Sequence, residues 1–338
     1  MTVSVAVFAY DGCFASGIAG PLDVFNIANT HNRVLHGEDA EPLFTWKVYS
    51  QDGKPIKTST GILLPASGSM NEIANVDVLI LPGIDHAYGY EVIDHAKRIN
   101  QAHGNWLIDL HSRGTTLASN CSGSFIFAET GLLNGREATT SWWLSRHFQQ
   151  RYPRVKLKQN KLVTSDNNIF CSGAFTSYLH QGIRLIETFT DSEIANRCAK
   201  TLLLQTKGAT QAPYIGLNER IDKMDDVVHQ AIVWMSENLH DEINIDRLAS
   251  DLAVSPRTFI RRFNQATGKP PKQYLQKLRI NEAKRLLEST NLSIDQITSR
   301  VGYSDVSSFR RLFKREVDLS PTEYRKRFCQ LETVEDVG

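Results

Sequence analysis

Ile245-Asp246-Arg247-Leu248 and Ile294-Asp295-Gln296-Ile297 begin two segments that repeat one pattern at an offset of 49 residues, and after one inserted residue the repeat continues at an offset of 50. The matched pairs are Leu252/Val301, Ala253/Gly302 and Ser255/Ser304, followed by Phe259/Phe309, Arg261/Arg311, Phe263/Phe313, Pro271/Pro321 and Tyr274/Tyr324. Two copies of one structural unit predict two copies of one contact.

Each copy has the pattern of a helix-turn-helix. Apolar residues recur at helical spacing, Ala253 or Gly302 occupies a predicted tight turn, and Ser255 or Ser304 follows where a helix would be capped. In the second helix of each copy the matched phenylalanines form an inward stripe, which leaves the other side facing outward. The outward residues that we predict to meet DNA are Arg257, Ile260 and Arg261 in the first copy, and Ser307, Arg310, Arg311 and Lys314 in the second.

The charge distribution favours a DNA-binding module over an ordinary helical bundle with a solvated basic face. Residues 255–330 contain 17 Lys and Arg against 7 Asp and Glu, although the whole chain has a net charge of only +1. The rest of the chain is therefore acidic, and one basic module is joined to a different domain, as in many DNA-binding proteins. Arginines suit guanine edges and phosphates, Ile260 suits a thymine methyl group, and Lys314 suits a phosphate. Arg262, beside the inward stripe, is predicted to form a structural salt bridge.

The repeat resembles the DNA-binding domain of AraC/XylS-type transcriptional regulators over about 100 residues. The resemblance lies in residues 245–263, in the intervening helix 274–287 with Arg279, Ala283 and Leu286, and in Val301-Gly302-Tyr303-Ser304, Phe309, Phe313-Lys314 and Ser320-Pro321-Thr322-Glu323-Tyr324-Arg325. It implies that the second helices of the two copies enter successive major grooves of double-stranded DNA, about 34 Å apart.

Length and composition predict two domains in a cytoplasmic protein. A chain of 338 residues can bury two cores, and it has no signal-like N-terminus and no apolar run of membrane-spanning length. Its five cysteines are scattered, without C-x-x-C pairs or a His/Cys ligand cluster. We therefore expect neither a disulfide framework nor a metal site, and no cofactor.

Residues 3–204 alternate strand-like and helix-like segments, which predicts an α/β fold with a flavodoxin-like parallel sheet sandwiched by helices. The expected strands are 3–8, 44–49, 78–81, 116–118 and 169–171. The expected helices are 21–29, 90–103, 124–130, 141–152, 175–189 and 191–204. Ligands of such sheets bind at the carboxyl ends of the strands.

Two of these strand ends have unusual residues. Leu81-Pro82-Gly83 ends a strand at a glycine, and Ser119-Asn120-Cys121-Ser122-Gly123 passes from strand to helix with a cysteine at the corner. This pattern predicts a nucleophile-elbow geometry in which nearby helix amides lower the pKa of the Cys121 thiol. The alternative is that Cys121 is a small buried hydrophobic residue.

This part of the chain resembles the ThiJ/PfpI, class I glutamine amidotransferase-like fold, and the whole chain resembles GlxA-type regulators that join this fold to an AraC-type domain. The resemblance lies in Gly20-Pro21-Leu22-Asp23-Val24-Phe25, Leu81-Pro82-Gly83, Cys121-Ser122-Gly123, residues 128–136 and Ala138-Thr139-Thr140. It implies a sensor pocket around Cys121. At positions where catalytic members have His or an acid, this chain has Ser122, Ser141 and Gly17, so no catalytic residue is predicted.

The predicted ligand-binding residues are Gly83, Cys121, Ser122, Ser141 and Trp142. A tryptophan face can hold an ammonium group, although Trp142 and Trp143 could equally be core residues. His86, Tyr88 and Tyr90 could line the same cleft or lie on a surface loop. Regulators similar to this chain respond to amino-acid derivatives or quaternary amines, so a small polar nitrogen compound is the expected effector.

We therefore predict a ligand-sensing domain over residues 1–204, a linker over 205–220, a DNA-binding domain over 221–330 and an acidic, disordered tail over 331–338. The predicted function is that of a homodimeric transcriptional regulator, an activator that contacts RNA polymerase. The alternatives are a thiol-dependent amidase or peptidase, a glyoxalase-like enzyme, and a redox sensor based on Cys121.

Overall fold

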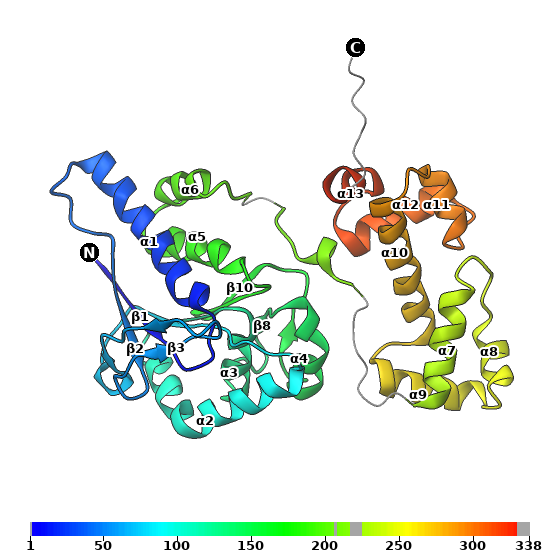
Figure 1. The fold of residues 1–338 in the computed structure, drawn as a ribbon, viewed down its shortest axis with the longest axis horizontal. Coiled ribbons are helices and arrows are strands. Elements are labelled where there is room, and N and C mark those ends of the chain that lie inside the picture. Colours follow the sequence, from blue (N-terminus) through cyan, green and yellow to red (C-terminus); the bar gives the residue numbers. More distant parts are fainter. Residues whose placement is uncertain (1, 206–207, 217–224, 330–338) are drawn as a thin grey trace, which may run out of the picture. The chain divides into compact units, whose positions relative to one another are not determined.

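The computed structural model describes residues 2–205, 208–216 and 225–329. The chain divides into two compact units, Met1–Gln211 and Ala212–Gly338, which are coloured from blue to green and from green to red in Figure 1. Within the described ranges, no helix is both long enough and apolar enough to cross a lipid bilayer. The predicted acidic tail lies outside the described residues. So do residues 206–207 and 217–220 of the predicted linker, and residues 221–224, which follow it.

The first unit is built on a seven-stranded sheet with the order β10-β11-β7-β6-β1-β2-β5. All neighbours pair in parallel except β10 and β11, which are antiparallel. The strands are β1 (Val3–Phe8), β2 (Phe44–Ser50), β5 (Gly68–Ser69), β6 (Val78–Leu81), β7 (Thr116–Ser119), β10 (Val163–Asp166) and β11 (Ile169–Ser172). Two smaller sheets pair β3 (Ile56–Lys57) with β4 (Leu63–Leu64), and β8 (Glu137–Ala138) with β9 (Lys156–Leu157).

Helices cover both faces of the sheet, as the alternation of segments predicts (Figure 1). On one face lie α1 (Ala15–His36), α5 (Ser177–Phe189) and α6 (Ser192–Thr201), and on the other lie α2 (Gly89–Ser112) and α3 (Ser124–Glu129). The segment 141–152, predicted as one helix, is the short 3-10 turn η3 (Trp142–Leu144) followed by α4 (Ser145–Arg151). Two further 3-10 turns are η1 (Met70–Glu72) and η2 (Cys121–Gly123).

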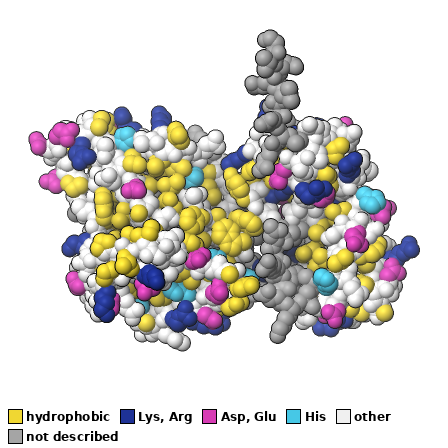
Figure 2. Space-filling model, in the orientation of Figure 1, with side chains coloured by type: hydrophobic (Ala, Val, Ile, Leu, Met, Phe, Trp, Pro, Cys, Tyr) yellow, Lys and Arg dark blue, Asp and Glu magenta, His cyan; other side chains and the backbone are white. Residues whose placement is uncertain are grey.

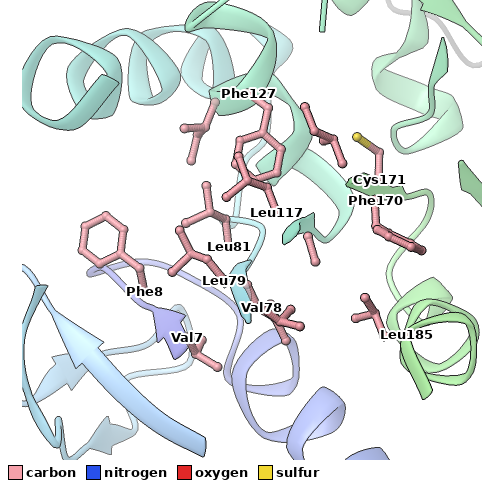
Figure 3. Packing of buried hydrophobic residues seen from close by; sticks show 14 of the residues in the cluster. Val7, Phe8, Val78, Leu79, Leu81, Leu117, Phe127, Phe170, Cys171 and Leu185 are labelled. Carbon is pink, nitrogen blue, oxygen red and sulfur yellow. The ribbon is translucent and has the colours of Figure 1, made fainter. Parts of the chain in front are cut away.

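The core of the first unit follows from strands that are apolar on both sides. Every residue of β6 and β7 is buried, which is the expected pattern for central parallel strands with helices on both faces. Figure 3 shows Leu79, Leu81 and Leu117 from these strands, with Phe127 of α3 on one side and Leu185 of α5 on the other. This packing holds the carboxyl ends of β6 and β7 at one edge of the sheet.

The second unit is all-helical. It contains the 3-10 turn η4 (Ala212–Tyr214) and the helices α7 (Asp226–Glu237), α8 (Ile245–Asp251), α9 (Pro256–Thr267), α10 (Pro271–Ser289), α11 (Ile294–Arg300), α12 (Val306–Val317) and α13 (Pro321–Phe328). The pairs α8–α9 and α11–α12 are the two predicted helix-turn-helix copies.

In the view of Figure 2, hydrophobic side chains form a patch on the first unit, whereas basic and acidic side chains are interspersed on the second.

Each copy has its own hydrophobic core, and α10 contributes to both. Tyr274 and Leu275, in the first half of α10, pack with Phe259 and Phe263 of the first copy. Ile280, Ala283, Leu286 and Leu287, in the second half, pack with the residues of the second copy, which include Phe309 and Phe313. The helix between the copies is therefore a shared structural element.

The predicted turns are confirmed, but one predicted cap is wrong. Ala253 and Gly302 have φ values of 56° and 77°, the left-handed conformation of a tight turn. Ser255 caps α9 by accepting from Thr258 N, whereas α12 is capped by Asp305, whose carboxylate accepts from Ser307 N and Ser308 N, and Ser304 is not the cap. The inserted residue precedes the cap, so at the offset of 50 Asp305 is the counterpart of Ser255.

Candidate ligand and DNA-binding sites

Cys121 lies at a sharp corner between β7 and α3. Its φ of 53° is in the left-handed region that few residues other than glycine adopt, at a cost of about 1–3 kcal/mol. The preceding residue fixes the corner, because the Asn120 amide donates to Gly17 O at 3.2 Å and its carbonyl oxygen accepts from Ser172 Oγ at 3.2 Å. The strand–corner–helix order is that of a nucleophile elbow.

Gly83, Cys121, Ser122 and Ser141 come together at the ends of β6 and β7, and we call these four residues the Cys121 cluster. Cys121 Sγ lies 2.7 Å from Ser141 Oγ, and Ser122 Oγ accepts from Ile84 N at 3.0 Å. A Cβ atom on Gly83 would lie 3.0 Å from Ser122 Oγ and 3.1 Å from Cys121 Cβ, so a glycine permits this close approach. The fifth predicted residue, Trp142, directly follows the cluster and is half-buried.

The cluster is closed rather than an open cleft. Cys121, Ser122 and Ser141 are 3%, 3% and 0% exposed. Burial raises the pKa of the Cys121 thiol, although hydrogen bonds from Ser141 and Ser122 act in the opposite direction. The predicted lowering of this pKa is therefore wrong, because desolvation of the thiolate outweighs its hydrogen bonds. A serine hydroxyl is no base at neutral pH, so its contact with Cys121 does not generate a nucleophilic thiolate.

Tyr10 is a component of this region that the sequence analysis missed. It follows β1 directly, is buried, and its hydroxyl donates to the carbonyl of Pro82, at the corner before Gly83. Burial raises its pKa well above the ordinary value, so the hydroxyl remains a donor at neutral pH. Its position directly after a predicted strand is the feature of the sequence that could have identified Tyr10 as part of this region.

Aromatic side chains connect the loop after β6 to the segment after Ser141. His86 Nδ1 lies 2.9 Å from the carbonyl of Ile84, which can only accept, so Nδ1 carries the proton and Nε2 accepts from Trp143 Nε1 at 3.1 Å. The rings of Trp142 and Trp143 meet edge to face at 5.4 Å. In the same loop the rings of Tyr88 and Tyr90 stack at 5.3 Å and are partly exposed.

A separate cavity of about 560 Å³ lies between β10, α5 and α6. Its lining combines apolar side chains such as Ile183 with the charged Lys161, Arg184 and Glu187. None of the five predicted ligand residues lines it. In the described part of the chain, no group of three or more His, Cys, Asp and Glu side chains is arranged to hold a metal ion.

In the first helix-turn-helix copy, α9 buries its aromatic side and exposes the predicted residues. Phe259 and Phe263 are fully buried, whereas Arg257, Ile260 and Arg261 are exposed. The predicted structural role of Arg262 agrees with its contacts, because its guanidinium donates to both carboxylate oxygens of Asp225 at 2.7 Å. Asp225 also caps α7, so this ion pair attaches α7 to α9.

In the second copy, α12 repeats this arrangement. Phe309 and Phe313 are fully buried. All four predicted residues of this helix are exposed, namely Ser307, Arg310, Arg311 and Lys314. The two helices thus present short, basic, outward faces on rigid cores.

Arg279 of α10 ties the two copies together. Its guanidinium donates to the carbonyls of Leu239, at 3.1 Å, and Asp241, at 2.7 Å, beyond the end of α7. It also lies 5.3 Å from the ring centre of Tyr303 in the turn of the second copy. One side chain therefore contacts both helix-turn-helix copies.

Family models match both units. The DJ-1/PfpI family model matches residues 3–187, which is more than half of the chain. A helix-turn-helix domain model matches residues 248–327.

Named relatives are regulators that resemble the chain across both units. The HTH-type transcriptional regulator GbdR of Pseudomonas aeruginosa (strain UCBPP-PA14) is 23% identical over 324 residues, which cover 96% of this chain and 84% of GbdR. The HTH-type transcriptional regulator CdhR of Pseudomonas aeruginosa (strain PAO1) is 26% identical over 284 residues, which cover 84% of this chain and 82% of CdhR. The activator RhaS of Escherichia coli is 34% identical over 110 residues, 32% of this chain and 40% of RhaS.

Among solved structures, a candidate transcriptional regulator from Vibrio parahaemolyticus has the fold of the first unit. It is 20% identical with a TM-score of 0.52, and the match covers 60% of this chain and all of that one. Full-length relatives that are named regulators place the chain with regulators rather than with thiol enzymes. The chain belongs to the DJ-1/PfpI family and is an AraC-type transcriptional regulator, in which a DJ-1/PfpI domain precedes a helix-turn-helix DNA-binding domain.

Proposed function

We propose that this regulator binds operator DNA through α9 and α12, and that a small polar nitrogen-containing effector, bound at Trp142 against the closed Cys121 cluster, controls this binding. The observation that carries the DNA-binding part is that both helices bury their phenylalanines and expose the predicted contact residues. α10 is part of both cores, so it holds the two faces at a constant spacing. A constant spacing is what reading of two successive grooves requires.

The exposed residues divide into two roles. Arg257, Arg261, Arg310 and Arg311 contact base edges, with Ser307 and Ile260 at adjoining positions, and Lys314 contacts a phosphate. Loss of a base contact costs about 1–3 kcal/mol and relaxes specificity at one position, whereas loss of a phosphate contact weakens binding to all sequences alike.

Binding to selected DNA tests these roles. Duplexes would be selected from a random library by the full-length chain, and their affinities measured by fluorescence anisotropy at several salt concentrations. Arg261→Ala and Arg310→Ala are expected to reduce specificity, and Lys314→Ala to lower the salt dependence. Arg184→Ala, in the first unit, is the matched control. Unchanged specificity in both arginine variants would contradict the proposed contacts.

The effector part rests on the aromatic side chains beside the Cys121 cluster. Trp142 follows Ser141 directly, and Trp143 is 36% exposed and held by His86. The face of a tryptophan ring attracts an ammonium group, and the main-chain groups at the strand ends can bind the polar part of a small metabolite. An amino-acid derivative or a quaternary amine combines these features.

Thermal stability measures effector binding directly, because a ligand that binds the folded state raises the melting temperature. Amino acids, betaines and polyamines would be screened with the full chain, with Trp142→Ala, and with Arg184→Ala in the cavity between α5 and α6. A shift that is lost in Trp142→Ala but kept in Arg184→Ala supports the proposed site. The opposite result would assign the effector to the other cavity.

We also propose that the regulator acts as a homodimer and activates transcription through contact with RNA polymerase, as the resemblance to AraC-type regulators implies. Sedimentation equilibrium of the full chain tests the first part. A monomer at micromolar concentration, with and without selected DNA, would contradict it.

A further inference from the structure

Gln211, the last residue of the first unit, has more contacts than a linker residue needs. It lies within the predicted linker 205–220, yet it is 1% exposed. Its side-chain nitrogen lies 3.1 Å from Thr140 O, 3.1 Å from Gln159 O and 3.0 Å from Lys161 O. Its side-chain oxygen accepts from Ala174 N at 2.8 Å, and its backbone N donates to Asn160 O at 2.8 Å.

A glycine provides the space for this side chain. A Cβ atom on Gly173 would lie 2.3 Å from Gln211 Nε2, so a larger residue there would displace the amide. A buried primary amide with this set of main-chain partners fixes the position of the backbone that carries it.

Part of the same backbone, at Thr140, adjoins the Cys121 cluster. Thr140, whose carbonyl binds Gln211, donates from its hydroxyl to Cys121 O at 3.1 Å. Ser141, the next residue, places its hydroxyl against the Cys121 thiol. Gln211 is therefore one residue removed from the proposed effector site.

The residues that follow Gln211 are fixed to the second unit. The carbonyl of Ile215 accepts from Lys284 Nζ of α10 at 2.7 Å. The hydroxyl of Tyr214 accepts from Arg327 of α13 at 2.8 Å, and its ring packs edge to face on Phe328 at 5.4 Å. Within four residues, the chain passes from a contact with Thr140, which adjoins the Cys121 cluster, to a contact with the helix that both helix-turn-helix cores share.

We propose that Gln211 is a positioning residue that couples the Cys121 cluster to the helix-turn-helix unit. A change in the position of Thr140 and Ser141 moves Gln211, and the short segment 212–215 transmits this movement to α10 and α13. The proposal rests on the proposed function, because it assigns the route by which an effector at that site would act. Coupling of this kind is a free energy shared by two sites, and it acts in both directions.

Hydrogen–deuterium exchange of the full chain, without effector or DNA, tests the coupling by itself. Ser141→Ala perturbs the Cys121 cluster, and exchange is read in peptides from residues 212–216, α10 and α13. We expect Ser141→Ala to change exchange in these peptides about 5-fold or more, and we expect Gln211→Ala to abolish that response when both changes are combined.

Two further variants keep the test decisive. Gln205→Ala changes an exposed glutamine whose described contact is made by its backbone carbonyl, so the response to Ser141→Ala should persist in that background. Gln211→Met keeps the side-chain volume but removes the amide, and it replaces Gln211→Ala if that variant does not fold. A response that survives both Gln211 substitutions, or no response to Ser141→Ala, overturns the proposal. Failure of effector binding in the thermal screen would overturn the proposed function while leaving this coupling measurable.

Discussion

Cys121 shows how burial decides the chemistry of a single residue. A cysteine at a helix N-terminus is often a thiolate, but here the side chain is almost fully buried and hydrogen-bonded to Ser141. Desolvation favours the neutral thiol and raises its pKa. The residue is therefore a structural centre of the cluster rather than a reactive thiolate.

The buried, neutral thiol of Cys121 is expected to be alkylated slowly. With iodoacetamide at pH 7.5, we expect the half-buried Cys329 to be modified well before Cys121, since the latter is protonated and inaccessible. Peptide mass spectrometry over a time course measures both rates, and denatured protein supplies the reference in which both react. Modification of Cys121 in the native protein as fast as Cys329 would show that the elbow carries a thiolate.

Lys284 is a buried amine whose ionisation affects stability. Burial lowers its pKa from 10.5 to about 8, the nearby Lys277 acts in the same direction, and Glu288 opposes both. Between pH 8 and 10.5 the unfolded chain retains a proton that the folded chain has lost, so the free energy of unfolding rises with pH. At 1.36 kcal/mol per pKa unit, the rise across this range is roughly 3 kcal/mol.

We predict that Lys284→Met removes this rise. Urea unfolding of the second unit at pH 8 and pH 10 measures it, with the exposed Lys326→Met as the control. Tyr324, 5.6 Å from the Lys284 amine, has a pKa raised by burial and by Glu288, so its ionisation in the unfolded chain near pH 10 lowers the free energy of unfolding, and the Lys326→Met control carries the same contribution. The same pH dependence in Lys284→Met and in the control would contradict the assignment.

The turns of the two helix-turn-helix copies differ in whether they can hold a residue with a side chain. Ala253 occupies the left-handed turn of the first copy, whereas in the second a Cβ atom on Gly302 would lie 2.3 Å from Leu239 O and 2.6 Å from Arg279. The end of α7 and the guanidinium of Arg279 pass directly over the second turn. The glycine is therefore required by packing as well as by backbone conformation.

Gly302→Ala should lower the free energy of unfolding of the second unit by more than about 2 kcal/mol. Backbone strain accounts for roughly 1–2 kcal/mol, and contact with a main-chain carbonyl adds to it. Gly268→Ala is the matched control, because Gly268 has a φ of 70° but open space around it. The decrease in its free energy of unfolding should therefore come from backbone strain alone. Equal losses in the two variants, measured by urea unfolding, would show that the close approach has no energetic effect.

Sequence patterns predicted elements best where a segment is uniformly apolar. The limits of β1 and β6 agree with the predicted strands to the residue, because buried parallel strands are nearly continuous apolar runs, which Ser4 alone interrupts in these two strands. β10 was missed, because Val163-Thr164-Ser165-Asp166 is short and polar and pairs only at the edge of the sheet. The break between η3 and α4 was also missed, since helical spacing does not distinguish a 3-10 turn from the helix that follows it.

For the whole molecule, separate cores predict separate unfolding. The first unit has one large core, and the second has two small ones joined by α10. Phe313→Ala removes a fully buried ring from the last core and should cost about 3–5 kcal/mol. We expect the urea midpoint of the second unit to fall while that of the first is unchanged.

Hydrogen exchange at increasing urea concentration reports the two midpoints independently. Phe148→Ala is the reciprocal control, since Phe148 is fully buried in the first unit and its loss should lower only the first midpoint. Equal shifts of both midpoints in either variant would mean that the chain unfolds as one cooperative body.

The sequence by itself determined the features that depend on neighbours along the chain. The duplicated helix-turn-helix, its inward phenylalanines, the alternating strands and helices and the corner at Cys121 all follow from periodicity and from the residues at each turn. These signals are local, so a reader of the sequence can recover them without knowing which segments meet.

Only the tertiary structure decided the features that depend on packing between distant segments. Gly83, Cys121 and Ser141 come from three different segments, and their mutual burial turned a predicted thiolate into a neutral thiol. Gln211 resembles a linker residue until Gly173 provides the space that buries it. Desolvation depends on what surrounds a group in space, and composition and spacing along the chain do not contain that information.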